Sequence, residues 1–356
     1  MARAAAAAPG AVRRALGGEH RLLDLGVGWG LHPALAPLRP FFERGLLAVV
    51  HGVGSPGPTR SHFDAQDFME SGTPGVRSTP DGWLNRVCGE LGHEGTPYRA
   101  VALTRATPRS LYGPEPALAV ADLEDLRLGA GGTPAAVDGG FESLYRETSE
   151  ELLRGSAESG FEAIELLESL RSVRGGTASG AEYPASPLGR SLRQIALLVR
   201  GGVGLEVAFA EAGGWDTHVQ QGSDGGSFAR QAAELASALR AFWLDLGESR
   251  DDVVVLTMTE FGRTVAENGS GGTDHGHGSC LFVLGSEVDG GRVHGTLESL
   301  VPDALHEGRD LPVTTDFRSV FAEVAGRHLG IDDDAALFPG WAGRRLPLLR
   351  GGAAGG

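Results

Sequence analysis

Three loops of this 356-residue chain carry acidic and histidine side chains of the kinds that bind metal ions. The candidate ligands are Asp216, His218, Glu260, Asp274, His275 and His277. Carboxylate and imidazole groups together suit Zn, Mn or Fe, and mixed sets often build metal sites for phosphoryl-type displacement. We therefore expect a divalent metal, with Zn favoured and Mn, Ca or Fe as alternatives.

Each cluster also has a structural interpretation. Asp216 could bond the backbone of a turn, and Glu260 could be a cap or the salt-bridge partner of Arg263. Three possible ligands so close together in a glycine-rich loop rarely serve packing, and glycines let a backbone approach an ion closely. Because the clusters follow successive predicted strands, a shared site is favoured over separate structural roles.

Ser61 and His62 add a candidate nucleophile and its neighbour. Ser61 lies between a predicted strand and a predicted helix, where free amides and the helix dipole favour an alkoxide or a bound anion. The alternative is a plain N-cap serine beside a satisfied histidine, and Asp64 and Asp67 could be ligands or simply favour the helix N-terminus. The sequence contains no Gly-x-Ser-x-Gly elbow, which makes a Ser-His-Asp triad less attractive.

These loops need a scaffold in which strands alternate with helices. Apolar periodicity predicts helices at 31–44, 61–70, 83–91, 188–200, 228–246 and 316–329, and strands at 46–50, 98–104, 205–210, 252–258 and 280–284. The run over 252–258 is rich in β-branched residues, as in a sheet covered on both faces. The pattern predicts a three-layer α/β/α sandwich with a mostly parallel central sheet, whose ligands lie beyond the carboxyl ends of the strands.

The domain plan has one principal unit over residues 25–345. Residues 1–24 form a low-information stretch, residues 108–187 a helical insertion with polar helices at 141–153 and 161–171, and residues 346–356 a flexible Gly/Ala tail. Cys88 and Cys280 lie far apart in apolar surroundings, so buried thiols are favoured over a disulfide.

The composition restricts partners and location. A net charge of −15 argues against nucleic acid and anionic membrane surfaces, and no stretch has the length of a membrane span. The Arg13–Arg14 pair lacks a following apolar core, so no export signal is recognised and the chain as written is cytoplasmic.

Several segments, in this order, resemble the bacterial domain of unknown function family number fifteen hundred and one. They include LAVVHGVG, TRSHFDAQDFMESG, GGWDTH and TEFGRTVAENGSGGTDHGHG. That family is grouped with the alkaline phosphatase and sulfatase superfamily. The resemblance implies that Ser61 is the nucleophile, that Asp216 and His218 are ligands of one metal, and that His275 or His277 completes this site.

The chain departs from the implied pattern in a ligand spacing, in one residue type and at its N-terminus. The spacing of Asp216 and His218 is shorter than in the superfamily, and Phe261 stands where a second histidine is expected. Family members usually begin with an export signal and a strand that supplies a metal-binding Asp, so this chain is expected to lack the N-terminal strand. Family members are usually exported to the periplasm or beyond the cell, and their genes often lie beside another exported family, which suggests a partner.

The leading hypothesis is a metal-dependent hydrolase of phosphate or sulfate esters with a small anionic substrate. Ser61 would attack, and Arg263 or Arg60 could bind the anionic group. One alternative is a non-catalytic exported metal-binding or assembly protein that keeps the fold. A second is a metal-free esterase that uses Ser61 with His62 or another histidine as base.

Overall fold

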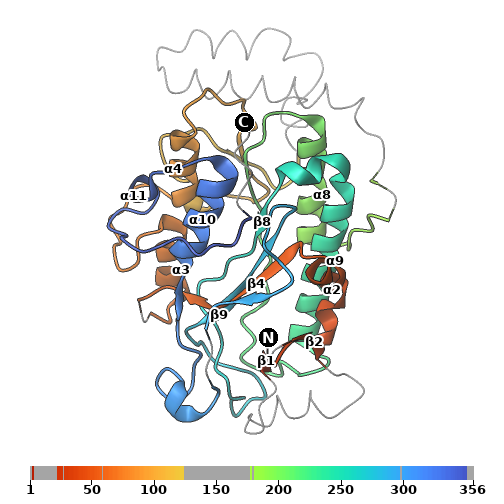
Figure 1. Ribbon diagram of the computed structural model, residues 1–356, viewed down its shortest axis with the longest axis vertical. Helices are drawn as coiled ribbons and strands as arrows, with labels where there is room; N and C mark the ends of the chain where they lie inside the picture. Colours follow the sequence, from red (N-terminus) through yellow and green to blue (C-terminus); the bar gives the residue numbers. More distant parts are fainter. Residues whose placement is uncertain are drawn as a thin grey trace, which may run out of the picture.

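A computed structural model describes residues 2–3, 22–26, 28–57, 59–123, 177–178, 180–296 and 299–350. The predicted helices at 141–153 and 161–171 lie outside these residues. Strands occupy the centre and helices cover both sides (Figure 1). This part of the chain is a mixed α/β protein.

The largest sheet has five strands. They are β4 (Leu47–Gly54), β8 (Val255–Leu256), β9 (Ser279–Leu284), β10 (Val293–His294) and β11 (Thr315–Asp316). β10 and β11 pair with β4 in parallel, whereas β9 is antiparallel to both β4 and β8. Four strands therefore share one direction, and the sheet is mostly parallel with β9 inserted in the opposite sense.

Two smaller sheets accompany the five-stranded one. A parallel sheet has the order β6-β5-β7, and an antiparallel one has the order β1-β3-β2. Their strands are β1 (Ala2–Arg3), β2 (Leu23–Gly26), β3 (Trp29–Leu31), β5 (Ala100–Ala102), β6 (Leu118–Ala119) and β7 (Val207–Phe209). β6 belongs to the predicted insertion at 108–187, yet it pairs with β5 and so is part of this sheet.

Two groups of helices lie on opposite sides of the strands (Figure 1). One group is α3 (His62–Ser71), α4 (Trp83–Glu90), α10 (Phe317–Leu329) and α11 (Asp334–Leu337), and the other is α2 (Arg39–Glu43), α8 (Pro187–Gly201) and α9 (Ser227–Asp245). Short 3-10 helices are η1 (Pro33–Leu38), η2 (Arg109–Leu111), η4 (Gly247–Asp252) and η5 (Pro302–Ala304).

The alternation of side chains along β4 builds a core on each face of the sheet. Leu47 and Val49 pack into the cluster that contains α8 and α9, whereas Ala48 and Val50 pack into the cluster that contains α10. All four are fully buried. A strand that is apolar on both faces therefore holds helices on both sides, as its sequence predicts.

Two predicted elements differ from the structure. The helix expected over 31–44 is η1 followed by the five-residue α2, because Pro33, Pro37 and Pro40 cannot donate backbone hydrogen bonds. The strand expected over 252–258 has only two residues, β8, and its neighbours are half-buried. Among the described residues β8 pairs with β9 alone, so its other edge lacks the partner that a fully buried strand would have.

The segment predicted as a tail at 346–356 begins within the core. Leu348 and Leu349 are buried, and their amides donate to the Glu323 carboxylate at 3.1 and 3.3 Å. Residues 351–356 lie outside the described part. Cys88 and Cys280 are both free thiols, and burial raises the pKa of Cys88 to about 11. None of the described helices combines the length and apolar character needed to cross a bilayer.

Candidate metal centre

The candidate residues lie in loops at one end of the strands of the five-stranded sheet. The loop after β4 leads to Ser61 and His62, and the loop after β8 carries Glu260. Because β9 is antiparallel to β4, the segment that enters β9, with His275, begins at the same end. The loop after β7 brings Asp216 to these side chains. Carboxyl ends of parallel strands thus meet there, as expected for an α/β sheet.

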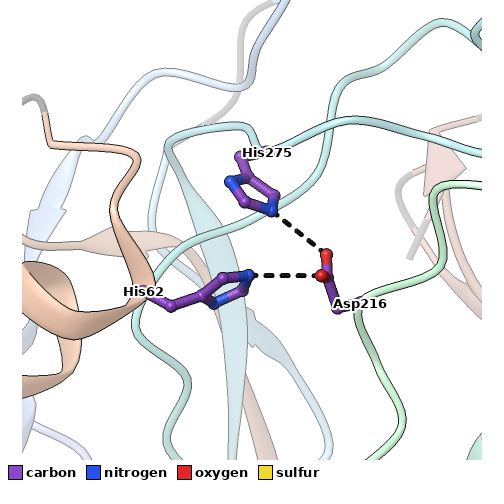
Figure 2. Close-up of side chains that lie close together, drawn as sticks. All are labelled: His62, Asp216 and His275. Carbon is purple, nitrogen blue, oxygen red and sulfur yellow. Dashed lines mark hydrogen bonds and ion pairs between the residues drawn. The ribbon is translucent and has the colours of Figure 1, made fainter.

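Three imidazoles surround the carboxylate of Asp216. The Nε2 atom of His218 lies 2.9 Å from Asp216 Oδ1, that of His275 lies 3.1 Å from the same oxygen, and that of His62 lies 3.4 Å from Oδ2. His218 and His275 also approach each other, with their Nε2 atoms 2.9 Å apart. Figure 2 shows the rings of His62 and His275 directed at Asp216 from separate segments. We call His62, Asp216, His218 and His275 the histidine cluster.

Each imidazole of the histidine cluster is held from behind through Nδ1. His62 Nδ1 lies 2.7 Å from Glu260 Oε1, and His218 Nδ1 lies 2.9 Å from Asp274 Oδ1. His275 Nδ1 lies 2.9 Å from the carbonyl oxygen of Arg60. Carboxylates and carbonyls only accept hydrogen bonds, so Nδ1 of each ring carries the proton. In the neutral rings, Nε2 therefore presents a lone pair.

Three lone pairs are consequently directed at the two carboxylate oxygens of Asp216. Without a cation among them they repel one another, since a neutral ring whose proton is on Nδ1 has nothing to donate at Nε2. The contacts among Asp216 Oδ1, His218 and His275 are 2.9–3.1 Å, close to the roughly 3.3 Å edge of a tetrahedron around a metal with bonds of about 2.05 Å, whereas His62 approaches the other oxygen, Oδ2, at 3.4 Å. His62, Asp216 and His275 place their ligand atoms within 4.8 Å of one another. The donor set fits a metal ion.

Asp216 stays ionised because Arg263 lies against it. Partial burial alone would raise its pKa, but the hydrogen bond from Arg263, at 2.5 Å, and the positive charge of Arg263 outweigh this, and the pKa of Asp216 is lowered to about 2. Arg263 also donates through Nε to the Thr273 hydroxyl and through Nη2 to the Thr273 carbonyl. Arg263, predicted as a residue that binds the anionic group, thus contacts Asp216 and Thr273.

Two predicted ligands, Glu260 and Asp274, contact histidines of the cluster and have no recorded contact with Asp216 among the described residues. Glu260 contacts His62, and Asp274 contacts His218, so both orient rings that face Asp216. Hydrogen bonds from Asn268 and His218 lower the pKa of Asp274, which keeps it a charged acceptor. Asn268 donates to Asp274 Oδ1 at 2.9 Å and to the His218 carbonyl at 3.0 Å. The sequence did not indicate Asn268 as a site residue, because a single Asn in a Gly/Ser-rich loop is usually part of a turn.

His277 packs against His306 and has no recorded contact with Asp216 among the described residues. Its ring stacks on His306, with centroids 4.5 Å apart. Burial, followed by the nearby His306 and Arg60, lowers the pKa of His277 and favours its neutral form. The structure therefore brings His275, and not His277, into the histidine cluster.

Ser61 caps α3, is exposed, and directly precedes His62 of the histidine cluster in the sequence. Its Oγ accepts a hydrogen bond from the Asp64 amide at 3.4 Å, so the N-cap expectation holds. Asp64 pairs with Arg77, and Asp67 pairs with Arg109, which gives both aspartates partners away from Asp216.

Phe261 forms an apolar wall of the site. Its ring centroid lies 4.8 Å from those of His62 and His275, and its side chain is buried. This is the position where the resemblance implied a second histidine. The phenyl ring limits rotation of two imidazoles without competing for a cation.

Two glycines let the site loops touch. A Cβ at Gly272 would lie 2.2 Å from the His218 carbonyl, and one at Gly276 would lie 2.5 Å from the carbonyl carbon of Arg263. The glycine-rich loop therefore serves close contact between backbones, which brings the histidines of separate loops together.

Comparison with known proteins gives one match. The family model described as a protein of unknown function (DUF1501) matches residues 49–338. This range includes the whole histidine cluster and the residues that hold it. No curated protein and no solved structure matches the chain.

Proposed function

The chain belongs to the DUF1501 family of proteins of unknown function, and we propose that it is a metal-dependent hydrolase of phosphate or sulfate esters. One observation carries the proposal. Three histidines with Nδ1 protonated direct Nε2 at a single ionised carboxylate, Asp216, and all are partly accessible. Metal-binding histidines almost always donate their second ring N–H to a carboxylate or carbonyl in this way.

His62, Asp216, His218 and His275 would hold the metal. Three nitrogens and one carboxylate oxygen favour Zn, with Mn or Fe next, and disfavour Ca, which prefers oxygen ligands. When bound, the ion would supply Lewis-acid activation of the ester and lower the pKa of a hydroxyl or water beside it. Catalysis also needs a coordination position for the ester, which would join this set as a fifth ligand or replace one of its members.

Ser61 is the proposed nucleophile. Its Oγ would attack the phosphorus or sulfur atom as the bond to the alcohol breaks on the opposite side, and the serine proton would pass through solvent to the departing alcohol. Water would then release phosphate or sulfate and restore the Ser61 hydroxyl. The position at the N-terminus of α3 places backbone amides and the positive end of the helix dipole next to the developing negative charge. Ser61 is exposed and its Asp64 contact is long, so the hydroxyl is free to turn toward a substrate.

The wider proposal is an alkaline-phosphatase-like fold. Support comes from two helical layers around a mostly parallel sheet, and from a serine that follows the central strand β4 and begins a helix.

An activity assay with matched variants tests the function. Zinc-loaded protein should hydrolyse an aryl phosphate or an aryl sulfate, and Ser61→Ala and His275→Ala should each lose the activity, whereas His277→Ala should retain most of it. Hydrolysis that survives a chelator would favour the metal-free serine esterase. Zinc binding without turnover of either ester would favour the non-catalytic metal-binding or assembly protein.

A further inference from the structure

A buried carboxylate beyond the histidine cluster, Asp310, is linked to His275 by two separate routes. Its side chain is fully buried, although it lies in the exposed loop that follows η5. It accepts hydrogen bonds from two guanidinium groups, from Arg60 Nη2 at 2.6 Å and from Arg309 Nε at 3.0 Å. Burial of a carboxylate is costly unless it is paired, so both contacts are needed in the folded state.

Both arginines hold His275. The carbonyl of Arg60 accepts the hydrogen bond of His275 Nδ1 at 2.9 Å, and Arg309 Nη2 donates to the carbonyl of His275 at 2.8 Å. The first contact sets the tautomer and the orientation of the ring, and the second sets the position of its backbone. Asp310 therefore connects the two attachments of one candidate ligand.

The backbone around Asp310 reinforces this connection. Asp310 forms a β-bridge with Thr264, close to Arg263, and the Val265 amide donates to the Arg309 carbonyl at 2.9 Å. The loop of Asp310 is thus fixed to the segment that carries Arg263, the partner of Asp216. The loop of Asp310 therefore helps to hold the segment that carries the partner of Asp216.

We infer that Asp310 is a positioning residue for the metal centre, which orients His275 by holding Arg60 and Arg309. This inference rests on the proposed metal site. Loss of the negative charge leaves Arg309 without its carboxylate partner and Arg60 with Glu307 alone, so the Arg60 carbonyl is held less firmly. Partners that orient a metal ligand in this way change metal affinity about 10- to 100-fold when they are removed.

The chain offers two matched controls. Glu307 also accepts from Arg60 Nη2, at 2.7 Å, but its side chain is 56% exposed and it has no contact with Arg309. Asp245 is as buried as Asp310 and pairs with Tyr183 and Arg200. Glu307 tests the shared arginine, and Asp245 tests the general cost of altering a buried carboxylate.

The experiment measures Zn²⁺ affinity by calorimetry, together with the rise in melting temperature that Zn²⁺ causes, in the full chain. Asp310→Asn should bind Zn²⁺ about 10- to 100-fold more weakly and show a smaller rise, whereas Glu307→Gln and Asp245→Asn should keep the affinity within about threefold. Should Asp310→Asn not fold, Arg309→Gln, at an exposed position, should still weaken binding severalfold.

Nitrogen-detected NMR of the histidine rings adds a readout that a general loss of stability does not change. The His275 ring signals should shift or broaden in Asp310→Asn and stay in place in Asp245→Asn. Wild-type affinity in both Asp310→Asn and Arg309→Gln would overturn the inference while leaving the metal site intact. Absence of Zn²⁺ binding in the wild-type protein would instead overturn the proposed function.

Discussion

Asp216→Asn is the substitution that removes the charge at the centre of the histidine cluster with the least change in shape. Within the described part of the chain, Asp216 is the one carboxylate that lies near all three Nε2 atoms, at 2.9, 3.1 and 3.4 Å. We expect its loss to weaken Zn²⁺ binding by about 100-fold or more, since removal of a ligand should cost at least as much as removal of an outer partner.

The magnitude follows from mass action. At a free Zn²⁺ concentration of about 100 times the wild-type Kd, binding stabilises the folded protein by about 2.7 kcal/mol, a rise in Tm of roughly 3–5 °C at this chain length. A 100-fold weaker variant gains only about 0.4 kcal/mol, which is a rise of less than about 1 °C.

The assay is differential scanning calorimetry with and without Zn²⁺, and Asp64→Asn is the control. Asp64 is also an aspartate in an ion pair with an arginine, Arg77, at 2.7 Å, but it has no contact with the histidine cluster. The control should show the full wild-type rise. An equal rise in Asp216→Asn would refute the placement of the metal.

Three further outcomes follow. Glu260→Gln should weaken Zn²⁺ binding about tenfold in titration calorimetry, because His62 Nδ1 loses a charged acceptor at 2.7 Å, and unchanged affinity would contradict this role. In the metal-free protein, the pKa of Asp216 is lowered from 3.8 to about 2, so its stabilising pairing with Arg263 is present above about pH 4 and is lost as pH falls toward 2. The Asp216 side chain is 46% exposed, so solvent screening reduces the stabilisation from this pairing to about 1 kcal/mol. In urea unfolding, the free energy of unfolding of the wild-type protein should exceed that of Asp216→Asn at pH 4, and this difference should disappear as the pH falls to 2; a difference that persists at pH 2 would contradict the prediction. Native Cys88, with a pKa of about 11, should react with iodoacetamide at pH 8 far more slowly than in urea, and equal rates would show that it is accessible.

The sequence predicts the general layout of the fold because its signals are local. Ser61 as a cap and the apolar periodicity of α3, α4, α8, α9 and α10 give these helices to within a few residues. The prediction was wrong at 31–44, where three prolines interrupt the hydrogen bonds of one continuous helix. It was also wrong in the length of β8, because strand length depends on a neighbouring strand that apolar content does not reveal.

The sequence could predict which residues lie near one another in the site, but not which of them contact each other. Position at strand ends brought Asp216, His218 and His275 together, while spacing alone could not show that Glu260 supports His62 from behind. The contribution of Asp310 depends on contacts between loops that are distant in sequence, so no local pattern indicates it.

X-ray absorption spectroscopy of the zinc-loaded protein tests the central claim most directly. The coordination expected from His62, Asp216, His218 and His275 is three imidazole nitrogens and at least one oxygen at about 2.0–2.1 Å, with the outer-ring scattering of imidazole, at one Zn²⁺ per chain. His275→Ala should lose one imidazole contribution. A zinc environment made of oxygen alone, or a protein that retains no Zn²⁺ after dialysis, would contradict the account.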